Sequence, residues 1–156
     1  MPKNKLNIRK VCNIDFDRLN EICLKGFPKD DAVDIVNSLY EMEHFYVAEL
    51  GKEQIIVGFV VFGIHSLRTA HIMILAVHPE FQRMSIGSDL LEFTLERIKE
   101  EYVTKVRLEV RIENDVAIKF YEQSKFKNIG ILEDYYDDGS NAYLMVRELE
   151  YPKKEK

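Results

Sequence analysis

Strict alternation of hydrophobic and charged residues predicts one strand in the second half of the chain. In KVRLEVR (105–111), Val106, Leu108 and Val110 share one face, and charged residues occupy the other. Runs rich in β-branched and aromatic residues predict further strands. These runs begin near Leu6 and also cover residues 44–50, 54–64, 70–77, 127–133 and 142–149.

Hydrophobic residues at helical spacing predict an amphipathic helix after Gly87. Its hydrophobic face consists of Leu90, Leu91, Leu95 and Ile98. Nearer the N-terminus, Asp15 is placed to cap a helix that ends near Gly26. The apolar residues of that helix are Leu19, Ile22 and Cys23. We expect two more helices, over residues 31–41 and 115–124.

The order of the predicted elements is β–α–α–β–β–β–α–β–α–β–β. This order is typical of the α/β or α+β class and predicts a mixed sheet with helices on both faces. The sequence contains no internal repeat or linker. We therefore expect one domain over residues 1–156, with a folded core at 5–149 and a tail at 150–156.

Composition and charge exclude several classes of function. The net charge of −5 at pH 7 leaves no basic excess for a general nucleic-acid binder. The longest apolar run, residues 55–64, is too short to span a bilayer, and the N-terminal segment lacks the apolar core of a signal peptide. Cys12 and Cys23 are the only cysteines, which favours a reducing, cytoplasmic location and predicts no metal site.

A polar segment joins the strand at 70–77 to the helix after Gly87. Unpaired amides at a helix N-terminus attract anions, and small residues such as Ser85 and Gly87 let a phosphate approach the backbone closely. Arg83 could add a charge-assisted contact. The alternative is an ordinary strand-to-helix turn, because the sequence has neither a P-loop nor a dinucleotide-binding glycine pattern here.

Two motifs resemble those of the GNAT acyl-CoA-dependent N-acetyltransferases. QRMSIG (82–87) is similar to the family's Q/R-x-x-G-x-G/A turn, with Ser85 in place of the first glycine. The second motif, LEVR…N…A…FY, lies within residues 108–121. The resemblance extends over residues 5–149. It implies a mixed, mostly antiparallel sheet of about seven strands flanked by about four helices, and acetyl-CoA as cosubstrate.

The resemblance also implies a set of acetyl-CoA-binding residues. In this family, successive backbone amides of the turn hold the CoA pyrophosphate. The implied set comprises Leu75, Ala76, Val77, Gln82, Arg83, Met84, Ser85, Ile86, Gly87, Ser88, Asn114 and Tyr121. Asn114 has the alternative role of a helix N-cap, and one residue could fill both roles.

The segment DYYDDGSNAYLM (134–145) is similar to the N-terminal (Nα) protein acetyltransferases within this superfamily. Ser140 and Asn141 replace an acidic pair that is frequent in those enzymes. The resemblance implies that four residues flank a groove for the peptide substrate, namely Phe27, Pro28, Tyr135 and Tyr136. Alternatively, the two tyrosines fill the core at a strand end.

In this family the amine attacks the acetyl thioester directly, so no serine or cysteine nucleophile is needed. The resemblance implies that Glu109 is the base and that Tyr121 gives a proton to the departing thiolate. His71 lies where some Nα-acetyltransferases carry a tyrosine that helps to hold a catalytic water. The pattern alone favours a solvent-exposed charged face for Glu109, between Arg107 and Arg111. It also allows purely structural roles for Tyr121 and His71.

Our hypothesis is an enzyme that transfers an acetyl group from acetyl-CoA to the α-amine of protein N-termini. An α-amino group suits a modest base, because its pKa of about 7.7–8.0 leaves about a tenth of it neutral at pH 7. The alternatives are acetylation of a small-molecule amine or a lysine side chain, and a non-catalytic acyl-CoA-binding module. We expect a monomer or homodimer with no nucleic-acid or membrane partner.

Overall fold

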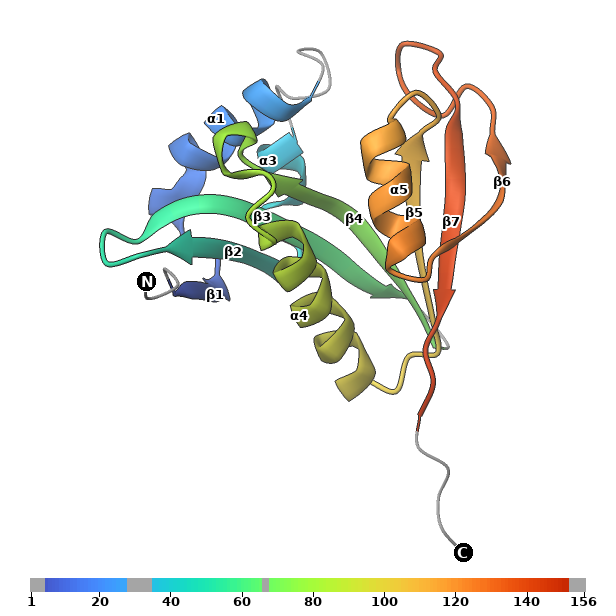
Figure 1. The fold of residues 1–156 in the computed structure, drawn as a ribbon, viewed down its shortest axis with the longest axis horizontal. Helices are drawn as coiled ribbons and strands as arrows, with labels where there is room; N and C mark the ends of the chain where they lie inside the picture. Colours follow the sequence, from blue (N-terminus) through green and yellow to red (C-terminus); the bar gives the residue numbers. More distant parts are fainter. Residues whose placement is uncertain (1–4, 28–34, 66–67, 152–156) are drawn as a thin grey trace, which may run out of the picture. The chain divides into compact units, whose positions relative to one another are not determined.

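The computed structural model describes residues 5–27, 35–65 and 68–151 (Figure 1). Its strands are β1 (Leu6–Lys10), β2 (His44–Leu50), β3 (Ile55–His65), β4 (Thr69–Val77), β5 (Lys105–Arg111), β6 (Lys127–Leu132) and β7 (Ala142–Glu148). Its helices are α1 (Phe16–Gly26), α3 (Ile35–Leu39), α4 (Ile86–Glu100) and α5 (Asp115–Gln123), with short 3-10 turns η1 (Asn13–Asp15) and η2 (Pro79–Phe81). The predicted order of elements is confirmed, and the helix expected at 31–41 is described only from Ile35. None of the helices in these ranges has the length and apolar character needed to cross a membrane.

The strands form a sheet with the order β1-β2-β3-β4-β5-β7-β6. Antiparallel pairing joins β1 to β2, β2 to β3, β5 to β7 and β6 to β7. The pair β4–β5 is parallel and matches residues 69–71 with residues 105–107. The expected mixed, mostly antiparallel sheet of seven strands is therefore confirmed.

The chain divides into two compact units. The first contains residues 1–63 and 73–97, and the second contains residues 64–72 and 98–156. The single domain expected from the chain length stays a prediction.

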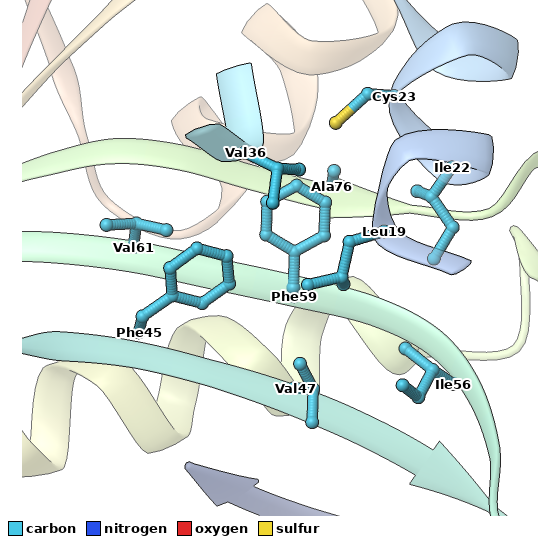
Figure 2. Close-up of a cluster of buried hydrophobic side chains, with 10 residues drawn as sticks. All are labelled: Leu19, Ile22, Cys23, Val36, Phe45, Val47, Ile56, Phe59, Val61 and Ala76. Atoms are coloured by element: carbon cyan, nitrogen blue, oxygen red, sulfur yellow. The ribbon is translucent and has the colours of Figure 1, made fainter. Parts of the chain in front are cut away.

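In the first unit, one face of the strands is covered by α1 and α3 (Figures 1 and 2). Helix α1 contributes the three predicted apolar residues, and all three are fully buried. The core cluster consists of Leu19, Ile22, Cys23, Val36, Phe45, Val47, Ile56, Phe59, Val61 and Ala76. The amphipathic pattern of the N-terminal helix is thus confirmed.

The opposite face of the same strands packs against α4. A Cβ atom built on Gly58 of β3 would lie 3.1 Å from Leu90 Cδ1 of α4 and 2.7 Å from the carbonyl oxygen of Ala76. The rings of Tyr46 and Phe93 meet edge to face with centroids 4.9 Å apart. The predicted hydrophobic face of α4 is buried. Helices therefore cover both faces of these strands, as expected.

Asp15 occupies the N-cap position of α1, but its side chain makes no capping bond to that helix. Its carboxylate instead accepts a 2.8 Å hydrogen bond from the Cys12 amide and thereby caps η1. Arg9 donates two hydrogen bonds to the same carboxylate, at 2.8 and 2.9 Å. Arg9 also pairs with the buried Glu49 at 3.1 Å. The predicted cap is therefore corrected: Asp15 caps η1 and binds Arg9 of β1, and Arg9 in turn pairs with Glu49 of β2.

The second unit contains β5, β7 and β6 side by side, with α5 between β5 and β6 in the chain (Figure 1). Along β5, Val106, Leu108 and Val110 are buried, which confirms the predicted alternation. The edge strand β6 is exposed along most of its length. A register shift between Asn128 and Gly130 interrupts its pairing with β7.

Candidate active site

Glu109 lies on β5, on the face opposite the buried valines and leucine. Its side chain is only 7% exposed. The solvent-exposed charged face suggested by the alternation pattern is therefore wrong at this position. A buried carboxylate in a protein needs a charged or hydrogen-bonding partner, because desolvation disfavours its ionised form.

Two side chains supply those partners, one for each carboxylate oxygen. His71 Nε2 lies 2.5 Å from Glu109 Oε2, and Arg107 Nη1 donates to Glu109 Oε1 at 2.6 Å. The parallel register of β4 and β5 explains this arrangement, because it aligns His71 with Arg107, and Glu109 follows two residues later on the same face. Sequence analysis did not find Arg107, although the alternation that placed Glu109 also places Arg107 beside it.

The balance of these contacts keeps Glu109 ionised. Burial by itself would raise the pKa of Glu109, but the hydrogen bond with His71 and the charges of His71 and Arg107 outweigh burial. The pKa of Glu109 therefore lies below its ordinary value of 4.5. At neutral pH the side chain can accept a proton.

Tyr135 and Tyr136 lie in the turn between β6 and β7, and their rings meet edge to face at 4.9 Å. Tyr135 is exposed and Tyr136 is partly exposed, so the core-filling alternative is wrong. Partial burial raises the pKa of Tyr135, and the charge of Glu109 and a hydrogen bond to it act in the same direction. Tyr135 is therefore an electrostatic neighbour of Glu109.

Tyr121 and Asn114 belong to α5 and its N-terminus. Tyr121 is buried and packs against Phe120 and Phe126, with ring centroids 5.1 and 5.6 Å away. Burial, followed by the nearby Tyr136, raises the pKa of Tyr121 well above its ordinary value, so the hydroxyl keeps its proton. The Asn114 side chain accepts a 3.2 Å hydrogen bond from the Ala117 amide, which confirms its N-cap role. A further role for either residue stays a prediction.

In the first unit, the turn at residues 82–88 leads into α4. The first helical hydrogen bond runs from the Asp89 amide to the Ser85 carbonyl at 3.0 Å. The amides of Ile86, Gly87 and Ser88 therefore precede the ladder of helical hydrogen bonds, at the positive end of the helix dipole. Amides in this position suit an anionic group such as a pyrophosphate.

Backbone angles explain why the family motif has a glycine where this chain has Ser85. Ser85 has a φ of 63°, and Arg83 has a φ of 70°, both in the left-handed region. Glycine adopts this region without steric cost, whereas another residue is strained there. The backbone of this turn therefore adopts, at Ser85, a conformation that glycine takes without strain. Met84, between these two residues, is half-exposed.

The strand end before this turn is held by close backbone contacts. Gly58 leaves room for the carbonyl oxygen of Ala76, as described above. The Gln82 side-chain amide donates to the Val77 carbonyl at 3.4 Å. Leu75 and Val77 are partly buried, and Ala76 is buried. The residues expected to bind acetyl-CoA in this unit thus form one continuous backbone path from Leu75 to Ser88.

His78 lies directly before the short 3-10 turn η2 and is buried. It is 1% exposed, its amide donates to the Val57 carbonyl at 2.8 Å, and its Nδ1 accepts from the Glu80 amide at 3.1 Å. Burial lowers the pKa of His78, so the ring is neutral at physiological pH. The sequence does contain a signal for this short helix: His78 can cap it, and Pro79 suits its first position.

Phe27 follows α1 and packs partly buried against the core of the first unit. This placement accounts for Phe27 as a packing residue, and its expected contact with a peptide stays a prediction. Pro28 lies outside the described residues. Within residues 5–27, 35–65 and 68–151, no group of three or more His, Cys, Asp or Glu side chains is arranged to hold a metal ion.

A family model described as the acetyltransferase (GNAT) family matches residues 15–126. This chain belongs to the GNAT acetyltransferase family. It is therefore a transferase, and the family expected from the two sequence motifs is confirmed. The match includes the turn at 82–88, the His71–Glu109 pair and α5 with Tyr121.

Individual GNAT proteins are similar to this chain over nearly its whole length. A relative named N-alpha-acetyltransferase, from Sulfolobus acidocaldarius, is 34% identical and aligns with 94% of this chain and 96% of its own. The crystal structure of Ard1 from Thermoplasma volcanium has a TM-score of 0.80 and 32% identity, covering 94% of this chain and 99% of that chain. A GNAT acetyltransferase from Elizabethkingia anophelis with acetyl-CoA bound shares the fold, with a TM-score of 0.78 and 18% identity, covering 94% and 100%.

Proposed function

We propose that this GNAT enzyme acetylates the α-amino group of protein or peptide N-termini. The observation that supports this proposal is the buried Glu109 carboxylate, which His71 and Arg107 hold in its ionised form. This arrangement supplies a base beside a tyrosine-bearing turn that can hydrogen-bond a peptide backbone. The similarity to N-alpha-acetyltransferases along nearly the whole chain supports the same substrate class.

Acetyl-CoA supplies the acetyl group as a thioester, which an amine can attack without a covalent enzyme intermediate. The amides of Ile86, Gly87 and Ser88 bind the pyrophosphate, with the guanidinium of Arg83 as a charge-assisted partner. Small side chains at Ser85 and Gly87 leave the backbone open for close approach. The backbone of Leu75 to Val77 continues this path toward the reacting end of the cosubstrate.

Glu109 acts as the general base. The incoming α-amine loses a proton to the Glu109 carboxylate, directly or through a water, as the nitrogen forms its bond to the acetyl carbon. His71 and Arg107 hold the two carboxylate oxygens, so the base keeps one orientation. An α-amine suits this base better than a lysine amine, because its pKa of about 7.7–8.0 lies more than two units below that of lysine.

Tyr121 acts as the general acid. As the carbon–sulfur bond breaks, the sulfur takes the phenolic proton, so CoA leaves as a neutral thiol. A buried tyrosine with a raised pKa stays protonated until that moment. Glu109 then releases its proton to solvent, and the Tyr121 phenolate takes up a proton from solvent. Both residues thereby return to their starting protonation states. Tyr135 and Tyr136 bind backbone groups of the peptide at the β6–β7 turn.

Steady-state kinetics on a peptide library test this function. Peptides varied at their first two residues should release CoA from acetyl-CoA only when the α-amine is free. The matched control is the same peptide with a blocked α-amine and a free lysine. Turnover of the blocked peptide, or of a polyamine in preference to every free peptide, would contradict the proposal and leave the family assignment intact.

A further inference from the structure

Arg111 is the last residue of β5 and reaches the turn between β6 and β7. Its Nη1 atom donates to both carboxylate oxygens of Asp138, at 3.0 and 3.2 Å. The guanidinium carbon lies 4.0 Å from the centre of the Tyr136 ring. One side chain therefore contacts both the aromatic residue and the acidic residue of this turn.

The turn itself is tightly hydrogen-bonded. The Tyr136 amide donates to the Ser140 carbonyl at 3.1 Å, and the Gly139 amide donates to the Tyr136 carbonyl at 2.8 Å. Asp138 accepts from the Ser140 amide at 2.9 Å. Gly139 has a φ of 84°, which glycine adopts without strain. These bonds fix the backbone of the turn, and the Tyr136 ring meets the Tyr135 ring edge to face.

The Arg111 guanidinium restrains the same ring from its face. A planar cation over an aromatic face restricts the rotation of the ring, and a rigid binding group loses less conformational freedom when a ligand binds. Strand pairing holds the backbone of Arg111, because Arg111 lies opposite Ala142 of β7. The amide of the next residue, Ile112, donates to the Asn141 carbonyl at 3.3 Å. Asp138 also holds the guanidinium through its two carboxylate oxygens.

We propose that Arg111 is a positioning residue for the acceptor peptide, which orients Tyr136 for hydrogen bonding to the peptide backbone. This inference rests on the proposed function and adds a residue to its substrate side. The Arg111–Asp138 pair borders solvent, since the Asp138 side chain is 54% exposed. Exposed ion pairs add little to folding stability. The effect of Arg111 should therefore appear in peptide binding rather than in melting temperature.

The central variant is Arg111→Met, which removes the planar cation and keeps an unbranched side chain. We expect the KM for peptide to rise about three- to thirtyfold, the range that corresponds to a cation–π contact of this kind. The KM for acetyl-CoA should change less than about twofold, within ordinary mutational scatter. Arg111→Lys should recover only part of the loss, because an ammonium lacks the planar fork.

Two matched variants separate positioning from general loss of an arginine. Arg97→Met removes an arginine that also lies over aromatic rings, at 5.5 Å from Tyr46 and 5.4 Å from Phe93, in the other unit. It should leave the KM for peptide unchanged. Asp138→Asn weakens the ion pair and keeps the cation–π contact, so its effect should be smaller than that of Arg111→Met.

A double-mutant cycle with Tyr136→Leu decides whether Arg111 acts through Tyr136. If it does, Arg111→Met should raise the KM for peptide in the wild-type background and add almost nothing in the Tyr136→Leu background. An unchanged KM in a folded Arg111→Met protein, or an equal rise in both backgrounds, would overturn this inference alone. A wild-type protein that acetylates no peptide would overturn the inference together with the proposed function.

Discussion

His71 on β4 and Glu109 on β5 meet through a 2.5 Å contact between Nε2 and Oε2. The contact depends on strand register, because the parallel pairing places His71 level with Arg107. It gives the buried carboxylate a hydrogen-bonding partner and leaves it ionised.

Replacing Glu109 with Gln should lower acetylation most strongly at low pH. The pKa of Glu109 is below 4.5, so the wild-type carboxylate is ionised throughout the neutral range, and falling pH protonates the amine substrate first. The base matters most where the amine is most protonated. The ratio of wild-type to variant kcat/KM, measured from about pH 6 to 9, should therefore fall as pH rises. Wild-type activity of the variant at every pH would show that another residue is the base, and His71 would be the next residue to test.

Replacing Tyr121 with Phe should lower kcat across the whole pH range. The pKa of Tyr121 is raised far above neutral, so its hydroxyl stays protonated and no pH restores a missing proton donor. General acid–base groups contribute about 10²–10⁴-fold, and we expect a loss in this range. Because the ring packing is kept, the melting temperature should change little. Equal kcat in the two proteins would leave Tyr121 as a packing residue.

Replacing Ser85 with Gly should preserve or tighten acetyl-CoA binding. Ser85 has a left-handed φ of 63°, which costs about 1 kcal/mol for a residue with a side chain. Calorimetry with acetyl-CoA and a thermal melt measure the two consequences separately. A large loss of affinity would instead show that the Ser85 hydroxyl contacts the cosubstrate.

Replacing Gly87 with Glu should weaken acetyl-CoA binding in a folded protein. The new side chain adds bulk and a negative charge at the N-terminus of α4, where we place the pyrophosphate. Gly87→Ala is the matched control, since it adds only a methyl group. Unchanged affinity of the Gly87→Glu variant would rule out this turn as the pyrophosphate site.

Replacing Gly58 with Ala should destabilise the first unit. The added Cβ would meet the carbonyl oxygen of Ala76 at 2.7 Å, and this backbone atom cannot move aside as a side chain could. Overpacking of this kind costs about 1–3 kcal/mol of unfolding free energy. Gly130→Ala is the matched control, because nothing lies within 4 Å of its added Cβ. Chemical denaturation that ranks the two variants equally would contradict the crowding seen here.

Local patterns were sufficient to predict most of the elements. The alternation of β5 and the helical spacing of α4 report which residues of one element share a face, and both are confirmed. The alternation pattern could not predict that Glu109 is buried. Alternation states only that Glu109 faces away from Leu108, and whether that face is covered depends on His71, which lies 38 residues away in sequence.

The same reason explains the residues that sequence reasoning placed incorrectly or missed. Asp15 is a suitable helix-capping residue, but its carboxylate binds Arg9 of β1 instead of the α1 amides. In the sequence, Arg111 is one of several charged residues on the same strand face. Its contacts with Asp138 and Tyr136 depend on the β5–β7 pairing, which only the structure shows. The family motifs located the turn at 82–88, and only the backbone angles explain how Ser85 replaces a glycine there.

The most direct measurement of the central claim is the position of the acetyl group on a peptide that carries both a free α-amine and an internal lysine. Fragmentation mass spectrometry after reaction with acetyl-CoA assigns that position. The account predicts acetylation of the N-terminal residue, with the lysine unmodified, and loss of this product in the Glu109→Gln variant near pH 6. Acetylation of the lysine in preference to the α-amine would contradict it.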